Sequence, residues 1–239
     1  MTRTATHSCT VPTDPFSPVP PAREAGPWHA VAVASPLPHS PGGTTRTGAR
    51  RPAWIERILP VLVLVAVLWV VELVDLLTPL RLDAYGIRPR ELAGLPGIVL
   101  APFLHLGFGH LIANTSGLLV LGALLAWTTR HLWVVTVGVV LLSGLGVWVF
   151  GGSNTVVIGA SGVVYGYAAF LAVYGFAARR FWQVLLGLLV ILLYGGLLWG
   201  VLPLRAGVSW QGHLFGALAG VGLALWLGRR AREARAAAR

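Results

Sequence analysis

Residues 132–150 read LWVVTVGVVLLSGLGVWVF, and no charged side chain interrupts this stretch. A helix needs roughly 20 consecutive apolar residues to cross the hydrocarbon core of a bilayer. Lipid offers no partner for backbone polar groups, so such a stretch is stable there only as a helix that closes its own hydrogen bonds. The stretch therefore predicts a membrane-spanning helix.

Further apolar stretches of similar length surround this one. We expect the other spans at about residues 59–77, 110–128, 159–178, 181–201 and 209–227. Only 11% of the 239 residues are charged, whereas soluble domains carry roughly 25%. The sequence thus predicts an all-α integral membrane protein with six transmembrane helices.

The segments outside the spans suggest the domain organisation. Residues 1–53 are rich in proline and lack an apolar period, which is typical of a disordered tail. We therefore divide the chain into this tail at 1–53, a membrane domain at 54–230 and a short basic tail at 231–239. The only cysteine, Cys9, lies in the first tail, which excludes an intramolecular disulfide and a cysteine-based metal site.

The chain carries a formal net charge of +10, and the positions of its arginines indicate an orientation. Arginines precede the first span, occur at Arg130 and at Arg179 and Arg180, and follow the sixth span. In a six-span chain these positions share one side, and basic flanks are retained in the cytoplasm. We expect both termini to be cytoplasmic, a bacterial plasma membrane as the location, and no nucleic-acid partner.

The connection between the first two spans, about residues 79–108, is longer than a plain connector needs to be. It is amphipathic and contains four prolines, at positions 79, 89, 96 and 102. We expect this first loop to lie partly in the membrane interface, with a simple solvated loop as the alternative.

Polar side chains inside apolar spans are costly, so each one needs a reason. Gly159-Ala160-Ser161-Gly162 stands at the predicted start of the fourth span, where free backbone N–H groups and the helix dipole stabilise negative charge. An oxyanion developing beside Ser161 would be stabilised there, and the flanking glycines let a substrate backbone approach. The alternative is that these small residues only permit close helix packing.

His213 lies in GHLFG, residues 212–216, at the predicted start of the sixth span. Histidine has the right pKa to activate a serine, and the alternative is a hydrogen bond to a loop carbonyl. His213 shares a helix face with glycines at 216 and 220, and Gly162 and Gly166 share a face of the fourth span. Two such faces permit close helix contact, which would bring His213 towards Ser161.

Three further side chains are candidates for the same site. His110 and Asn114 lie one turn apart on the second span and share a face, so their N–H groups suit an oxyanion hole; interhelical hydrogen bonding is the alternative. Tyr165 lies one turn after Ser161, where it could stack on the imidazole or simply pack. No carboxylate has an obvious place in a triad, so a Ser–His dyad is the simpler hypothesis. No metal is expected, because the sequence has no H-E-x-x-H motif.

These motifs, in this order, resemble the rhomboid family of intramembrane serine proteases. The resemblance rests on HLIAN at 110–114, GASGVVYG at 159–166 and GHLFGALAG at 212–220, and it covers about residues 54–230. It implies a six-helix rhomboid-like bundle with a long first loop. It also implies a protease that cuts membrane-protein substrates, single-span or polytopic, near the membrane surface without a cofactor.

The resemblance also implies residue roles. Ser161 would be the nucleophile and His213 the general base. His110, Asn114 and the backbone N–H of Ser161 would form the oxyanion hole, with support from Tyr165, Gly159 and Gly162. Many family members carry a Trp-Arg pair in the first loop, whereas this chain reads LRL at 80–82. That departure leaves the anchoring of the first loop open.

Two other functions fit a six-span chain. A rhomboid-like protein without protease activity would bind and escort membrane clients, and the retained Ser161 and His213 favour the enzyme instead. A small transporter would line a pathway with its buried His and Asn side chains. Transporters often show paired repeats and broken helices, which this sequence does not.

Overall fold

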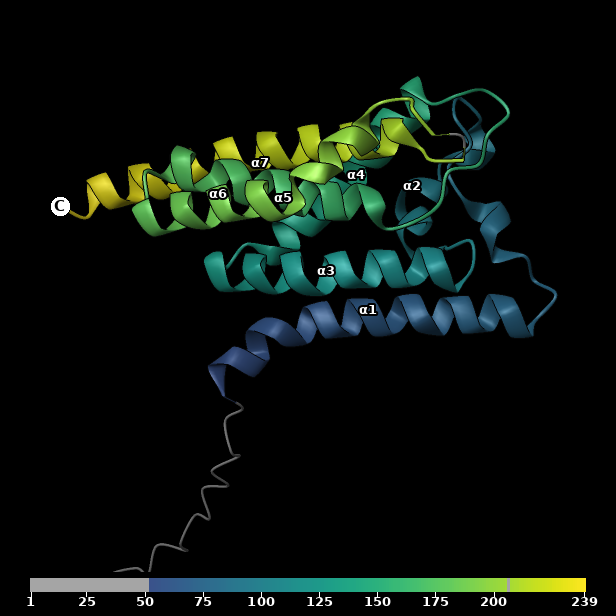
Figure 1. Ribbon diagram of the computed structural model, residues 1–239, viewed down its shortest axis with the longest axis horizontal. Coiled ribbons are helices and arrows are strands. Elements are labelled where there is room, and N and C mark those ends of the chain that lie inside the picture. Colours follow the sequence, from purple (N-terminus) through teal and green to yellow (C-terminus); the bar gives the residue numbers. More distant parts are fainter. Residues whose placement is uncertain (1–51, 206) are drawn as a thin grey trace, which may run out of the picture. The chain divides into compact units, whose positions relative to one another are not determined.

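A computed structural model describes residues 52–205 and 207–239 (Figure 1). Within these ranges the structure contains helices and connecting loops but no named strand, and six helices are long and apolar enough to cross a bilayer. The protein is therefore a multi-pass membrane protein, as the sequence predicts. The predicted disordered tail lies outside the described residues, apart from residues 52 and 53.

The spanning helices agree closely with the predicted stretches. They are α1 (Ala53–Leu77), α3 (Phe108–Thr128), α4 (Leu132–Phe150), α5 (Ser161–Ala178), α6 (Phe181–Tyr194), which the 3₁₀ helix η4 (Gly195–Val201) continues, and α7 (Trp210–Ala237). The helix α7 runs well past its expected end at 227. Its last turns consist of Arg, Glu and Ala, which favour helix, so most of the segment that we assigned to a basic tail is helical.

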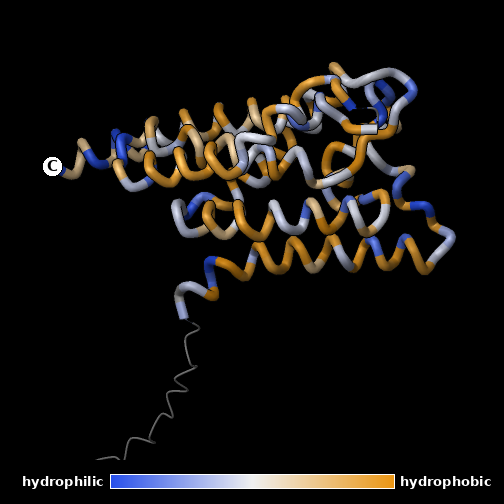
Figure 2. The backbone as a smooth tube through the Cα atoms, viewed as in Figure 1, coloured by the Kyte–Doolittle hydropathy of each residue, from blue (hydrophilic) through white to orange (hydrophobic). Residues whose placement is uncertain are grey.

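The helix α5 lies at the centre of the bundle. It contacts α3, α4, α6 and α7, and it is the most buried of the six spans. The outer helices α1 and α6 are the least buried, and Figure 2 shows apolar residues along the length of α1. A residue at the start of α5 therefore has protein on several sides, and α5 is less apolar than the outer helices α1 and α6.

The helices α5 and α7 make the closest packing contact, through glycines. A Cβ atom at Gly216 would lie 2.9 Å from the carbonyl carbon of Gly162 and closer still to its oxygen. Gly220 meets Gly166 in the same way one turn later. The two small-residue faces that the sequence indicates thus meet, because only helices without side chains at these points can approach so closely.

The first loop is folded against the helices. It contains η1 (Leu82–Tyr85), η2 (Leu92–Gly94), α2 (Gly97–Leu100) and η3 (Ala101–Phe103). An isolated pair of backbone hydrogen bonds, each 2.9 Å, joins Ile87 to Val157 in the α4–α5 connection. Its position relative to the membrane interface stays a prediction.

Arg90 anchors this loop, which answers the question raised by the missing Trp-Arg pair. Its guanidinium donates hydrogen bonds to the carbonyl oxygens of Val149 and Gly151, at 3.0 and 2.8 Å, and to Ser153 Oγ at 2.7 Å. Trp148 Nε1 donates to the carbonyl oxygen of Glu91 at 2.9 Å. These bonds hold the middle of the loop to the end of α4, while the Leu82 N–H holds its start to the Asp75 carboxylate of α1.

Candidate active site

Ser161 and His213 make the central contact of the site. Ser161 is the first residue of α5 and His213 lies in the first turn of α7. His213 Nε2 lies 2.9 Å from Ser161 Oγ, a hydrogen bond between residues 52 positions apart in the chain. The glycine contact between α5 and α7 sets this distance, because Ser161 directly precedes Gly162 and His213 lies one turn before Gly216.

The other ring nitrogen of His213 is bonded to a backbone carbonyl before α7, the kind of partner that the sequence analysis gave as the alternative to a catalytic role. His213 Nδ1 lies 2.8 Å from the carbonyl oxygen of Gly200 in η4. A carbonyl can only accept, so Nδ1 is assigned the proton and Nε2 is left to accept from the Ser161 hydroxyl. A backbone carbonyl therefore takes the position that a carboxylate holds in a three-residue triad.

Tyr165 completes the surroundings of the imidazole. Its ring is stacked on His213 with the centroids 4.0 Å apart and the planes 6° from parallel. A Cβ atom at Gly200 would collide with the Tyr165 hydroxyl and would lie 3.1 Å from His213 Nδ1. Close packing on one face and a hydrogen bond at one edge together fix the orientation of the ring.

His110 and Asn114 face the same cavity from α3. Asn114 is buried, and its Nδ2 has no hydrogen-bond partner within the described part of the chain. Both side chains approach Gly159, whose φ is +110° and whose Cβ, if present, would lie 2.5 Å from His110 Cε1. Only glycine satisfies that backbone conformation and that close approach, which explains why α5 begins at Ser161 rather than at 159.

One cavity of about 670 Å³ collects all these side chains. Its lining includes His110, Asn114, Ser161, Tyr165 and His213. A buried amide donor that lacks an acceptor, beside a serine paired with a histidine, is an arrangement suited to stabilising an oxyanion. The first turn of α5 begins beside this cavity, because Ser161 lines it, and the first N–H groups of a helix have no partner within the helix.

Residues 93–230 match the Rhomboid domain family. The chain belongs to the rhomboid family of intramembrane proteases. It is 45% identical to uncharacterized proteins of Mycobacterium tuberculosis and Mycobacterium bovis over 217 residues, 87% of this chain and 90% of theirs. An uncharacterized protein of Mycobacterium leprae is 42% identical over 205 residues, 78% of each chain.

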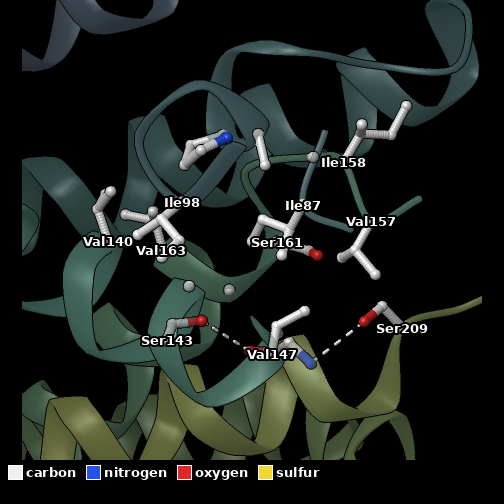
Figure 3. A pocket seen from close by; sticks show the side chains of 16 residues that line it. Ile87, Ile98, Val140, Ser143, Val147, Val157, Ile158, Ser161, Val163 and Ser209 are labelled. Atoms are coloured by element: carbon white, nitrogen blue, oxygen red, sulfur yellow. Dashed lines mark hydrogen bonds between the residues drawn. The ribbon is translucent and has the colours of Figure 1, made fainter. Parts of the chain in front are cut away.

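Two serines hold the start of α7 in this rhomboid. Ser209 Oγ accepts a hydrogen bond from the Gly212 N–H at 3.3 Å, and Ser143 Oγ donates to the Gly212 carbonyl at 3.2 Å (Figure 3). Figure 3 also shows Ser161 beside a small cavity of about 40 Å³, with Ile87 and Val157 on its wall. Gly212 directly precedes His213, so these bonds help to position the imidazole.

Ionisable groups outside the spans complete the site. His105, just before α3, is buried, and its ring lies 5.1 Å from that of His110. Burial and the nearby His110 lower the pKa of His105 to about 4, so it is neutral at physiological pH. Asp83 borders the cavity, and burial together with Asp75 raises the pKa of its carboxyl. The described residues contain no group of three or more His, Cys, Asp or Glu placed to hold a metal ion.

Proposed function

We propose that this rhomboid is an intramembrane serine endopeptidase that cleaves transmembrane-helix substrates near the membrane surface by a Ser–His dyad. The observation that carries the proposal is the 2.9 Å hydrogen bond from Ser161 to an imidazole whose other nitrogen is paired with the Gly200 carbonyl. A serine is a weak nucleophile until a neighbouring base accepts its proton. This pairing supports His213 as that base, in the tautomer whose Nε2 can accept the serine proton.

The reaction would begin when His213 Nε2 removes the Ser161 proton as Oγ attacks a substrate carbonyl carbon. The imidazolium then gives its proton to the leaving amine, and an acyl-enzyme remains on Ser161. A water molecule, deprotonated by His213, hydrolyses that ester and restores the serine. Because the Gly200 carbonyl accepts from Nδ1–H, it also stabilises the positive charge on the ring.

The negative charge that develops on the substrate oxygen needs donors. Asn114 Nδ2 supplies one, His110 a second and the backbone N–H of Ser161 a third, with the dipole of α5 adding to them. The buried Asn114 nitrogen supports this role. A buried donor without an acceptor costs free energy, and the oxygen of a bound substrate would supply the acceptor. Tyr165 keeps the imidazole in place, while Gly159 and Gly162 let the substrate backbone reach Ser161.

The substrates in this proposal are single-span or polytopic membrane proteins. A peptide bond in a membrane helix is protected by its hydrogen bonds, and breaking these bonds in lipid is costly. The cavity of about 670 Å³ supports local unwinding, because its polar side chains can replace the lost partners. Cytoplasmic termini, a bacterial plasma membrane, and the absence of any cofactor or nucleic-acid partner belong to the same proposal.

The test is co-expression with a tagged single-span reporter, followed by labelling of the same membranes with a fluorophosphonate probe. Wild type should give a membrane-proximal fragment and a labelled band, and Ser161→Ala neither. Ser116→Ala is the matched control, because Ser116 is an exposed α3 serine bonded only to its own helix. No labelling of the wild type would favour a client-binding protein without protease activity. Labelling of Ser161→Ala would show that a residue other than Ser161 reacts with the probe and would refute Ser161 as the nucleophile.

A further inference from the structure

Two cavities lie along one side of α1 and share no lining residue with the cavity that holds Ser161 and His213. The first, of about 400 Å³, is lined at the start of α1 and at the α3–α4 connection by residues that include Arg57, Arg130 and Trp133. The second, of about 210 Å³, is lined by apolar side chains such as Leu68 and Val137. Trp133 borders both cavities. We call the two cavities together the α1–α4 slot.

The slot follows one face of each helix. On α1 its lining residues fall at positions 56, 57, 60, 64 and 68, and on α4 at 132, 133, 136, 137, 140 and 141. These spacings of three and four place the residues of each helix on a single face. The helix α1 packs on α3 and η3, whereas α4 packs mainly on α7, α5 and α2. The faces of α1 and α4 that line the slot are therefore not packed mainly on each other.

The length of the slot corresponds to one leaflet. The eleven steps from Arg57 to Leu68 rise about 1.5 Å each, which gives about 16.5 Å. The hydrocarbon core of a bilayer is roughly 30 Å thick, so the slot covers about half of it. Charged groups at one end and apolar side chains along the rest match the two parts of a lipid in a single leaflet.

The charges at the open end select among lipids. Arg57 and Arg130 contribute two positive charges and Glu56 one negative charge, which leaves one positive charge. The exposed ring of Trp133 at this level is typical of a residue at the headgroup boundary. Basic pockets between membrane helices bind anionic headgroups.

We propose that the α1–α4 slot binds one anionic glycerophospholipid of the surrounding leaflet. Its phosphodiester lies on Arg57 and Arg130, and one acyl chain lies between α1 and α4 against Leu64 and Val137. The bound lipid fills the space that α1 leaves beside α4, and so ties α1 to the bundle. This inference does not depend on protease activity, and its test does not use it.

The test is native mass spectrometry of the full-length protein released from nanodiscs of phosphatidylcholine with 30% phosphatidylglycerol. Wild type should retain one phosphatidylglycerol in preference to phosphatidylcholine. The double variant Arg57→Gln, Arg130→Gln should lose roughly 20- to 30-fold in that preference, since each arginine contributes a factor of about five. Glu56→Gln should raise it by a similar factor of about five. The matched control is Arg180→Gln, an exposed arginine in the α5–α6 connection.

A second variant tests the chain-binding part. Val137→Trp fills the slot and should abolish retention of the lipid, whereas Leu142→Trp, on the opposite and exposed face of α4, should not. Equal retention by wild type and the double arginine variant, or equal loss in Arg180→Gln, would overturn the headgroup assignment. If wild type retained phosphatidylcholine as well as phosphatidylglycerol, the assignment to an anionic lipid would be overturned. If Val137→Trp still retained the lipid, the position of the acyl chain would be overturned.

Discussion

Substitution of Gly216 by alanine should separate α5 from α7 and break the contact between Ser161 and His213. The added Cβ would lie 2.9 Å from the carbonyl carbon of Gly162, whereas carbon atoms in favourable contact are about 3.5 to 4.0 Å apart. The helices must therefore move apart by about 0.6 Å or more. If His213 moves with α7, its 2.9 Å distance to Ser161 Oγ becomes about 3.5 Å, the outer limit of a hydrogen bond.

Two measurements follow from this displacement. Overpacking of this kind costs about 1 to 3 kcal/mol, so the apparent melting temperature in detergent should fall. Under the proposed function, cleavage of a reporter in proteoliposomes should fall on the order of 100-fold, because a misplacement of about 1 Å has that effect on reacting groups.

The control for this prediction lies on the same helix. A Cβ atom at Gly222 would meet nothing within 4 Å, so Gly222→Ala should leave stability and cleavage close to wild type. The reasoning is refuted if Gly216→Ala keeps the melting temperature and cleavage rate of wild type, or if Gly222→Ala loses as much.

Three other changes probe separate parts of the molecule. Asn114→Ala should lower kcat on the order of 10²- to 10³-fold with little change in KM, by loss of an oxyanion donor; a smaller effect than that of Tyr165→Phe would contradict both roles. Arg90→Gln removes the guanidinium that bonds three acceptors and should cost about 1 to 3 kcal/mol in thermal unfolding; an unchanged melting temperature would show that the loop is held elsewhere. The pKa of native His105, about 4, lies below its unfolded value near 6.5. The contribution of neutral His105 to the free energy of unfolding is therefore fully present above pH 6.5 and is lost as pH falls to 4. The melting temperature of wild type should therefore fall more between pH 7 and 4 than that of His105→Gln, and parallel curves would contradict the assignment.

The sequence predicts the presence of each span better than the residues at which the span begins and ends. The six spans follow from apolar runs, because crossing a bilayer constrains about 20 consecutive residues at once. The ends of the spans depend on local detail. Gly159, with its positive φ against His110, delays the start of α5, and helix-favouring residues carry α7 to Ala237. Mean hydropathy detects neither effect, because it depends on neither the backbone angle of a glycine nor the helix propensity of charged residues.

The sequence by itself determined the membrane class, the six helices and the residue types that gather at the cavity, because each of these has a signature in side-chain chemistry or spacing. Only the tertiary structure decided that the Gly200 carbonyl orients His213 and that Arg90 anchors the first loop. The acceptors are backbone carbonyls, apart from the Ser153 hydroxyl that also accepts from Arg90. Every residue carries such a group, so no sequence pattern distinguishes the one that is used, and only the packing of distant helices brings it within hydrogen-bonding distance.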